Sequence, residues 1–88
     1  MKLIIAIMRD SDTESVSQAL VRNGYRVTRV ASTGGFLRRG STTLMVGTDE
    51  GKVDPAIEII RANLGPISEP DINRANLFII NVEHFHQI

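Results

Sequence analysis

Four short apolar runs along the chain are separated by stretches of other periodicity. Residues 2–8 are apolar at successive positions from Leu3 to Met8 and rich in isoleucine, a pattern typical of a central strand covered on both faces. Shorter runs enriched in β-forming residues follow at 25–31, 42–46 and 77–82. The pattern therefore predicts four strands.

Two helices are expected between these strands. Polar side chains at residues 9–12 are able to cap a helix, and Val16, Ala19 and Leu20 give an apolar stripe that leads to the stop signal Asn23-Gly24. A second stripe spans 53–64, with Pro55 tolerated in the first turn and Gly65-Pro66 beyond the end. The polar segment that follows, up to residue 75, is expected to be irregular.

The order strand, helix, strand, strand, helix, strand predicts an α+β ferredoxin-like fold over residues 1–88, one domain with both helices on one face of an antiparallel sheet. Because the first strand is apolar on both sides, the other sheet face would expose a large apolar patch in a monomer. We therefore expect self-association through the sheet. Three sheets around one axis would cover three such faces, although periodicity alone does not give the stoichiometry.

Composition narrows the possible partners and compartments. At 88 residues the chain has room for one modest core. Ten basic and ten acidic residues balance, so no broad positive field exists to attract a nucleic acid polymer. The lack of cysteine fits a reducing compartment, and the run at 2–8 is too short to cross a bilayer. We expect a cytoplasmic protein with no membrane partner.

The most informative chemistry lies between residues 26 and 47. Glycines there let backbone amides approach an anion, and hydroxyl groups can donate to phosphate or ribose oxygens. Arginine has a fork that matches phosphate, and Phe36 offers a flat face to a base. Strand alternation puts Arg26 and Thr28 on one face. The mixture indicates a nucleotide site, and the alternative is an ordinary Gly-Gly turn with solvated arginines.

One run in this segment has a specific resemblance. It reads Ala31-Ser32-Thr33-Gly34-Gly35-Phe36-Leu37-Arg38-x-Gly40-x-Thr42-Thr43, with Arg26-x-Thr28 before it and Gly47 and Phe85-His86-Gln87 after it. In this order the chain resembles the cyclic-di-AMP receptor branch of the PII-like proteins over about its whole length. That family is ferredoxin-like and trimeric, binds the cyclic dinucleotide in clefts between subunits, and catalyses no reaction.

The resemblance implies a homotrimer with no resident cofactor, whose ligand is cyclic di-AMP or another adenine nucleotide and whose state is read by an unidentified downstream protein. The ligand-binding residues it implies are Arg26, Thr28, Thr33, Gly35, Phe36, Leu37, Ser41, Gly47, Phe78 and Gln87. Phe36 and Leu37 would cradle a base, Gly47 would leave room for the ligand, and the Gln87 amide would read a base edge. For Phe78, core packing is the alternative role.

Two departures from the family pattern suggest a second function. Ser41 stands where the family usually has asparagine. An amide that can both donate and accept through separate atoms is thus replaced by a single hydroxyl group. The segment 65–75 is a short link where the family has a long excursion with extra strands. The alternative is therefore a PII-like interaction module that has lost or changed its nucleotide ligand.

Three other classes are disfavoured by the residues present. His84 and His86 could face one side of an extended segment, but a transition-metal site would need more ligands than the chain offers. No serine, histidine and acid show a nucleophile-elbow pattern, so we do not expect an enzyme. Nitrogen-regulating PII proteins carry a modifiable tyrosine in a long loop, whereas the single tyrosine here is Tyr25.

Overall fold

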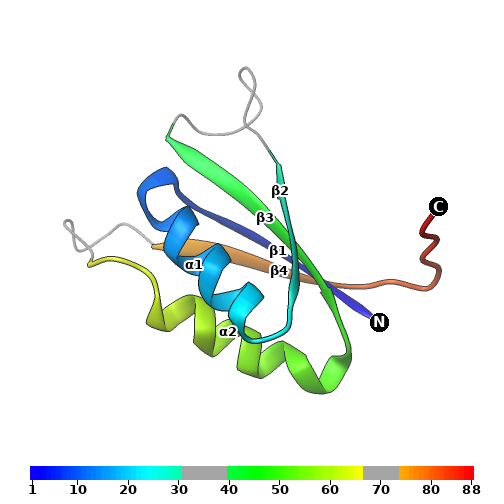
Figure 1. The fold of residues 1–88 in the computed structure, drawn as a ribbon. Helices are drawn as coiled ribbons and strands as arrows, with labels where there is room; N and C mark the ends of the chain where they lie inside the picture. Colours follow the sequence, from blue (N-terminus) through cyan, green and yellow to red (C-terminus); the bar gives the residue numbers. More distant parts are fainter. Residues whose placement is uncertain (31–39, 67–73) are drawn as a thin grey trace.

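Two helices pack on one face of a four-stranded antiparallel sheet in the computed structural model, which describes residues 1–30, 40–66 and 74–88 (Figure 1). The elements are β1 (Lys2–Arg9), α1 (Asp10–Arg22), β2 (Arg26–Val30), β3 (Ser41–Thr48), a 3-10 turn (Glu50–Lys52), α2 (Val53–Ala62) and β4 (Ala75–Asn81). Their order and packing confirm the predicted α+β ferredoxin-like fold. No helix within the described residues is long and apolar enough to cross a membrane.

The strand order is β2-β3-β1-β4, which puts β1 in the centre as its apolar pattern predicts. Its register aligns Ile4 with Val46 of β3 and with Ile79 of β4. Because side chains alternate along a strand, Ile4 and the other even-numbered positions of β1 face the helices. The largest fully buried side chains of this layer are Ile4, Met8, Val16, Leu20, Leu44, Val46 and Ile60.

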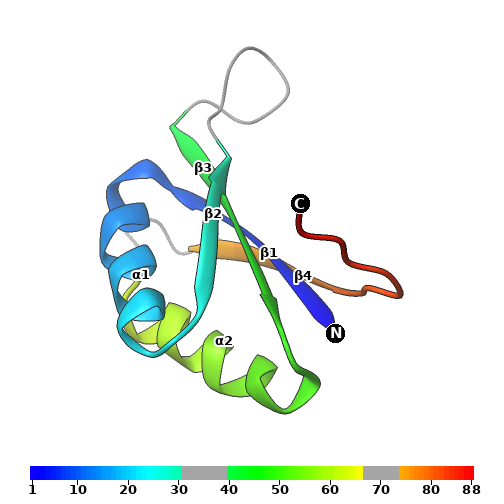
Figure 2. The same cartoon turned by 45° about the vertical axis from the view of Figure 1, so that its right-hand side comes forward.

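The opposite side of the sheet also carries apolar residues, and we call it the open face. It is formed by Leu3, Ile5, Ile7, Met45, Phe78 and Ile80. Phe78 is 54% exposed and Ile80 is 45% exposed. Both helices lie on the other side of the sheet (Figures 1 and 2), so neither covers this apolar surface. Phe78 therefore does not take the core-packing role within the protomer.

The first helix starts where the sequence predicts, but it is not capped by a side chain as expected. Arg9 is the N-cap residue, and no side chain caps the helix there. The Asp12 carboxylate accepts hydrogen bonds from elsewhere: the Arg9 Nε lies 3.0 Å from its Oδ2, and the backbone N–H of Gly65 lies 3.0 Å from its Oδ1. Arg9 also donates to the carbonyl oxygen of Pro66 at 3.1 Å. Asp12 thus joins the β1–α1 junction to the segment after α2.

Replacing Asp12 with alanine is expected to lower the free energy of unfolding by about 1–3 kcal/mol, because it leaves the partly buried N–H group of Gly65 and the guanidinium of Arg9 without their acceptor. Asp12 is 6% exposed, so water does not readily replace the lost carboxylate. Urea denaturation at fixed protein concentration measures the change. Asp54→Ala is the control, since Asp54 is exposed in the first turn of α2. Equal losses in the two variants would contradict the role assigned to Asp12.

The strand ends extend further than the sequence pattern predicts. β3 runs from Ser41 to Thr48 rather than over 42–46, and β4 begins at Ala75 rather than at 77. Polar residues enter these strands because β1 pairs with both neighbours along nearly its full length, from Lys2 opposite Thr48 to Arg9 opposite Ser41. Backbone pairing with a central strand therefore overrides side-chain polarity at the ends.

Candidate functional site

A cavity of about 620 Å³ lies on the open face, beneath residues 82–88, which we call the tail. Figure 2 shows the tail on the side of the sheet away from both helices. We call this space the tail cavity; it is lined by Met1, Leu3, Arg26, Thr28, Met45, Gly47, Val82, Phe85 and Gln87. Its volume falls within the usual range of small-molecule sites.

Strand pairing explains how three predicted residues meet in this cavity. Arg26 and Thr28 are two apart on β2, so their side chains point to the same sheet face. The register places Arg26 opposite Gly47 and Thr28 opposite Met45. Gly47 in turn lies opposite Leu3 of the central strand. The shared face expected for Arg26 and Thr28 is the one that lines the tail cavity.

The tail brings in the fourth predicted residue, Gln87. An Arg26 Nη1 donates to the Gln87 Oε1 across 3.5 Å, a long hydrogen bond between residues 61 positions apart. The start of the tail is held separately, because the backbone N–H of Val82 donates to the carbonyl oxygen of Met1 at 3.0 Å. Two contacts therefore place the tail against the sheet.

The cavity has the charge that an anionic ligand requires. Of its described lining side chains, Arg26 is cationic and none is a carboxylate. Arg29, on the other face of β2, is instead paired with Glu14 of α1 at 3.0 Å. The hydrogen bond from Arg29 lowers the pKa of the Glu14 carboxyl, with Gln18 contributing a second bond. The two arginines of one strand thus differ: Arg29 is partnered by a carboxylate, whereas Arg26 faces the cavity.

Gly47 leaves space in the tail cavity because it has no side chain. A Cβ atom added there would lie 3.1 Å from the Met1 Cε, closer than ordinary contact. The missing side chain therefore leaves space in which the flexible end of Met1 now lies. Because a methionine side chain changes rotamer readily, this space is available to a ligand that displaces it.

Other predicted residues are not brought to this point within one protomer. Ser41 lies six positions from Gly47 along β3, a separation of about 20 Å in an extended strand. Phe78 shares a row with Thr28 but lies three strands away, about 14 Å across the sheet. Thr33, Gly35, Phe36 and Leu37 lie outside the described residues, as do 67–73 of the short link.

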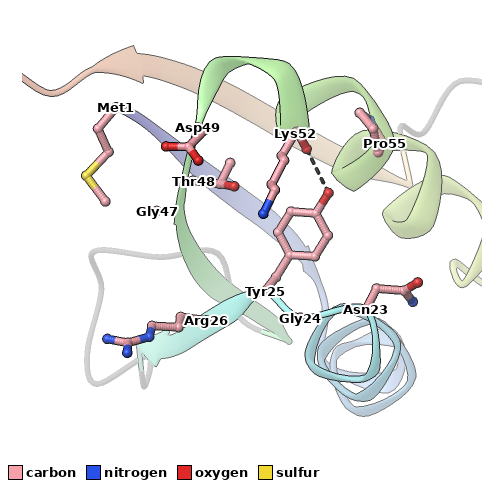
Figure 3. Close-up of a pocket in the computed structure, with 10 residues that line it drawn as sticks. All are labelled: Met1, Asn23, Gly24, Tyr25, Arg26, Gly47, Thr48, Asp49, Lys52 and Pro55. Atoms are coloured by element: carbon pink, nitrogen blue, oxygen red, sulfur yellow. Dashed lines mark hydrogen bonds between the residues drawn. The ribbon is translucent and has the colours of Figure 1, made fainter.

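A second hollow of about 390 Å³ borders the first and is shown in Figure 3. We call it the Tyr25 pocket. The Tyr25 hydroxyl donates to the backbone carbonyl oxygen of Lys52 at 2.8 Å, and the carboxylate of Asp49 also lines the space. Arg26 extends away from Tyr25 and Lys52 in this view. The Tyr25 pocket is smaller than the tail cavity, and the opposite charges of Lys52 and Asp49 in its lining offset each other, so the tail cavity is the better candidate for a large anionic ligand.

Several residues of the tail cavity were missed by the sequence reasoning. Leu3, Met45, Val82 and Phe85 supply its apolar walls. A signal for Phe85 was present, since it stands two residues before Gln87 and an extended segment places such neighbours on one side. For metal binding, the described part of the chain contains no cluster of three or more His, Cys, Asp or Glu residues, so His84 and His86 have no assembled partners there.

Comparison with known proteins identifies the family of this chain. The family model described as "Cyclic-di-AMP receptor" matches residues 1–67, which include β2, β3 and the segment between them. A solved structure, described as a functionally unknown protein from Pediococcus pentosaceus ATCC 25745, is 30% identical with a TM-score of 0.79. The match covers 99% of this chain and 96% of that one, so the similarity includes β4 and the tail. The chain belongs to the cyclic-di-AMP receptor family of PII-like proteins.

Proposed function

We propose that this protein is a signal-transduction receptor that binds cyclic di-AMP in clefts between the subunits of a homotrimer. The observation that carries the proposal is the convergence of Arg26, Thr28, Gly47 and Gln87 on one cavity. These residues come from two strands and the tail, and each matches the family pattern. Membership of a receptor family supports the same function, and no catalytic step is proposed.

The groups in the cavity suit the parts of a cyclic dinucleotide. Its phosphates are anionic and accept bonds from the guanidinium of Arg26 and the hydroxyl of Thr28. The Gln87 amide can both donate and accept, which suits the edge of an adenine. Because Arg26 and Gln87 already contact each other, a phosphate and a base edge of one small ligand can be reached together.

The separation of the predicted residues supports a site shared by subunits. Ser41 and Phe78 lie too far from Arg26 for one small ligand to touch all three within a protomer. A neighbouring copy that contributes the distant residues would complete the site. The open face also provides an apolar surface that a monomer would leave in water. Closed rotational symmetry allows three such faces to bury one another.

The second candidate function is an interaction module with a lost or changed ligand. Ser41 favours it, because one hydroxyl cannot reproduce the bonds of the amide usual in the family. The shortened link after α2 would also present a different surface to a partner.

Isothermal titration calorimetry separates the two functions. The full chain titrated with cyclic di-AMP is expected to release or absorb heat with one ligand per protomer, and cyclic di-GMP serves as the comparison for base identity. The absence of heat at high micromolar protein would contradict the assignment of cyclic di-AMP. If cyclic di-AMP does not bind, a thermal-shift panel of adenine nucleotides and other cyclic dinucleotides separates the two functions. Stabilisation by one compound indicates a sensor of that ligand, whereas stabilisation by none of them favours the interaction module.

A further inference from the structure

Phe85 is a solvent-exposed aromatic residue on the wall of a preformed cavity. It exposes 62% of its surface, yet it lines the tail cavity together with Leu3, Met45 and Val82. A large apolar side chain left in water is unfavourable unless something covers it. Its position thus calls for an occupant of the cavity with an apolar face.

The lining of the cavity is divided by chemistry. The polar side chains are on β2 and at Gln87, whereas the apolar ones come from Met1, β1, β3, Val82 and Phe85. A nucleotide is divided in the same way, with a charged phosphate at one end and a flat base at the other. With a phosphate at Arg26, the base would therefore be directed toward the apolar walls that include Phe85.

The tail is held by one contact on each side of Phe85. Three residues earlier, Val82 is bonded to the Met1 carbonyl oxygen, and two residues later Gln87 is bonded to Arg26. A segment restrained on both sides limits the positions that the Phe85 ring can take, so less conformational entropy is lost when a ligand stacks on the ring. A preorganised ring of this kind is typical of residues that stack on nucleic acid bases.

We propose that Phe85 stacks on one adenine of the bound cyclic dinucleotide. The inference rests on the proposed function and deepens it. Cyclic di-AMP has two adenines, and Phe36, which lies outside the described residues, is the residue predicted to cradle a base. Phe85 supplies a second flat surface from a segment beyond the residues matched by the family model. The walls made by Leu3 and Met45 would contact the edges of the same base.

Calorimetry on Phe85 variants of the full chain tests this proposal. Phe85→Ala is expected to weaken cyclic di-AMP binding by about 5- to 100-fold, the usual effect of losing one base–aromatic stack. Phe85→Tyr should retain affinity within about threefold, because its ring has the same stacking face. The matched control is Ile88→Ala, which removes another exposed apolar side chain of the tail that does not line the cavity.

A spectroscopic measurement distinguishes stacking from simple packing. In proton NMR of the bound ligand, a ring stacked on Phe85 shifts the adenine H2 or H8 signal upfield. Phe85→Leu should lose that shift even if it still binds, because leucine fills the space without a π system. If wild-type protein shows no binding, the proposed function fails. If wild type binds and Phe85→Ala binds equally well, or the upfield shift persists in Phe85→Leu, only the stacking proposal is overturned.

Discussion

Replacing Arg26 with alanine is expected to weaken cyclic di-AMP binding by about 10- to 100-fold while the fold remains intact. Arg26 is the cation among the described side chains that line the tail cavity. Hydrogen bonds to an ionised group contribute about 1.5–3 kcal/mol each, and the ligand phosphate would lose its charged partner. Arg26 is exposed and lies on an edge strand, so truncation should leave the core unchanged. Calorimetry measures the affinity, and circular dichroism checks the fold.

The same strand provides a matched control for that experiment. Arg29 is three residues along β2 and faces the helices, where it is paired with Glu14. Arg29→Ala removes the same side chain from the same strand and should leave the affinity within about twofold. Arg26→Lys should fall between wild type and alanine, because lysine keeps the charge without the fork. Equal losses for Arg26→Ala and Arg29→Ala would contradict a direct role of Arg26.

The fold could be predicted because its periodic signals are strong and agree with one another. The continuous apolar run of residues 3–8 occupies the centre of the sheet, and the two helical stripes supply the buried Val16, Leu20 and Ile60. The strand ends could not be predicted, because polar residues such as Thr48 are paired through their backbones. The contact between Asp12 and Gly65 could not be predicted for a related reason: the two residues are 53 positions apart, whereas capping rules consider only local neighbours.

In the candidate site, too, the features that depend on local sequence could be predicted, and those that depend on distant contacts could not. Strand alternation alone placed Arg26 and Thr28 on one face. The position of Gln87 came from the family resemblance, and its contact with Arg26 depends on how the tail returns across the open face. No strand or helix period in residues 82–88 marks that path, and the spacing of Phe85 two residues before Gln87 was not used, so Phe85 was missed as a lining residue. Residues that reach a site through irregular backbone carry little sequence signal for their location.

Phe78→Glu is expected to convert the proposed trimer into monomers. Phe78 lies on the open face, and burial of such a side chain stabilises an assembly by about 1.5–3 kcal/mol per copy. A carboxylate in its place would lose that contribution and would cost several kcal/mol more if buried without a partner. Since the ligand clefts are proposed to lie between subunits, cyclic di-AMP binding should fall with the trimer. Size-exclusion chromatography with light scattering measures the mass at micromolar concentration.

Val21→Glu is the matched control, because it adds the same charge at a residue of similar exposure on the helix side of the molecule. Val21 of α1 is 58% exposed, against 54% for Phe78, and α1 packs on the opposite sheet face. This variant should remain trimeric and bind ligand normally, since neither the open face nor the tail cavity is altered. A trimer that survives Phe78→Glu would show that the subunits associate through another surface. A wild-type monomer would overturn the shared-cleft arrangement itself, because Ser41 and Phe78 would then have no route to a ligand held at Arg26.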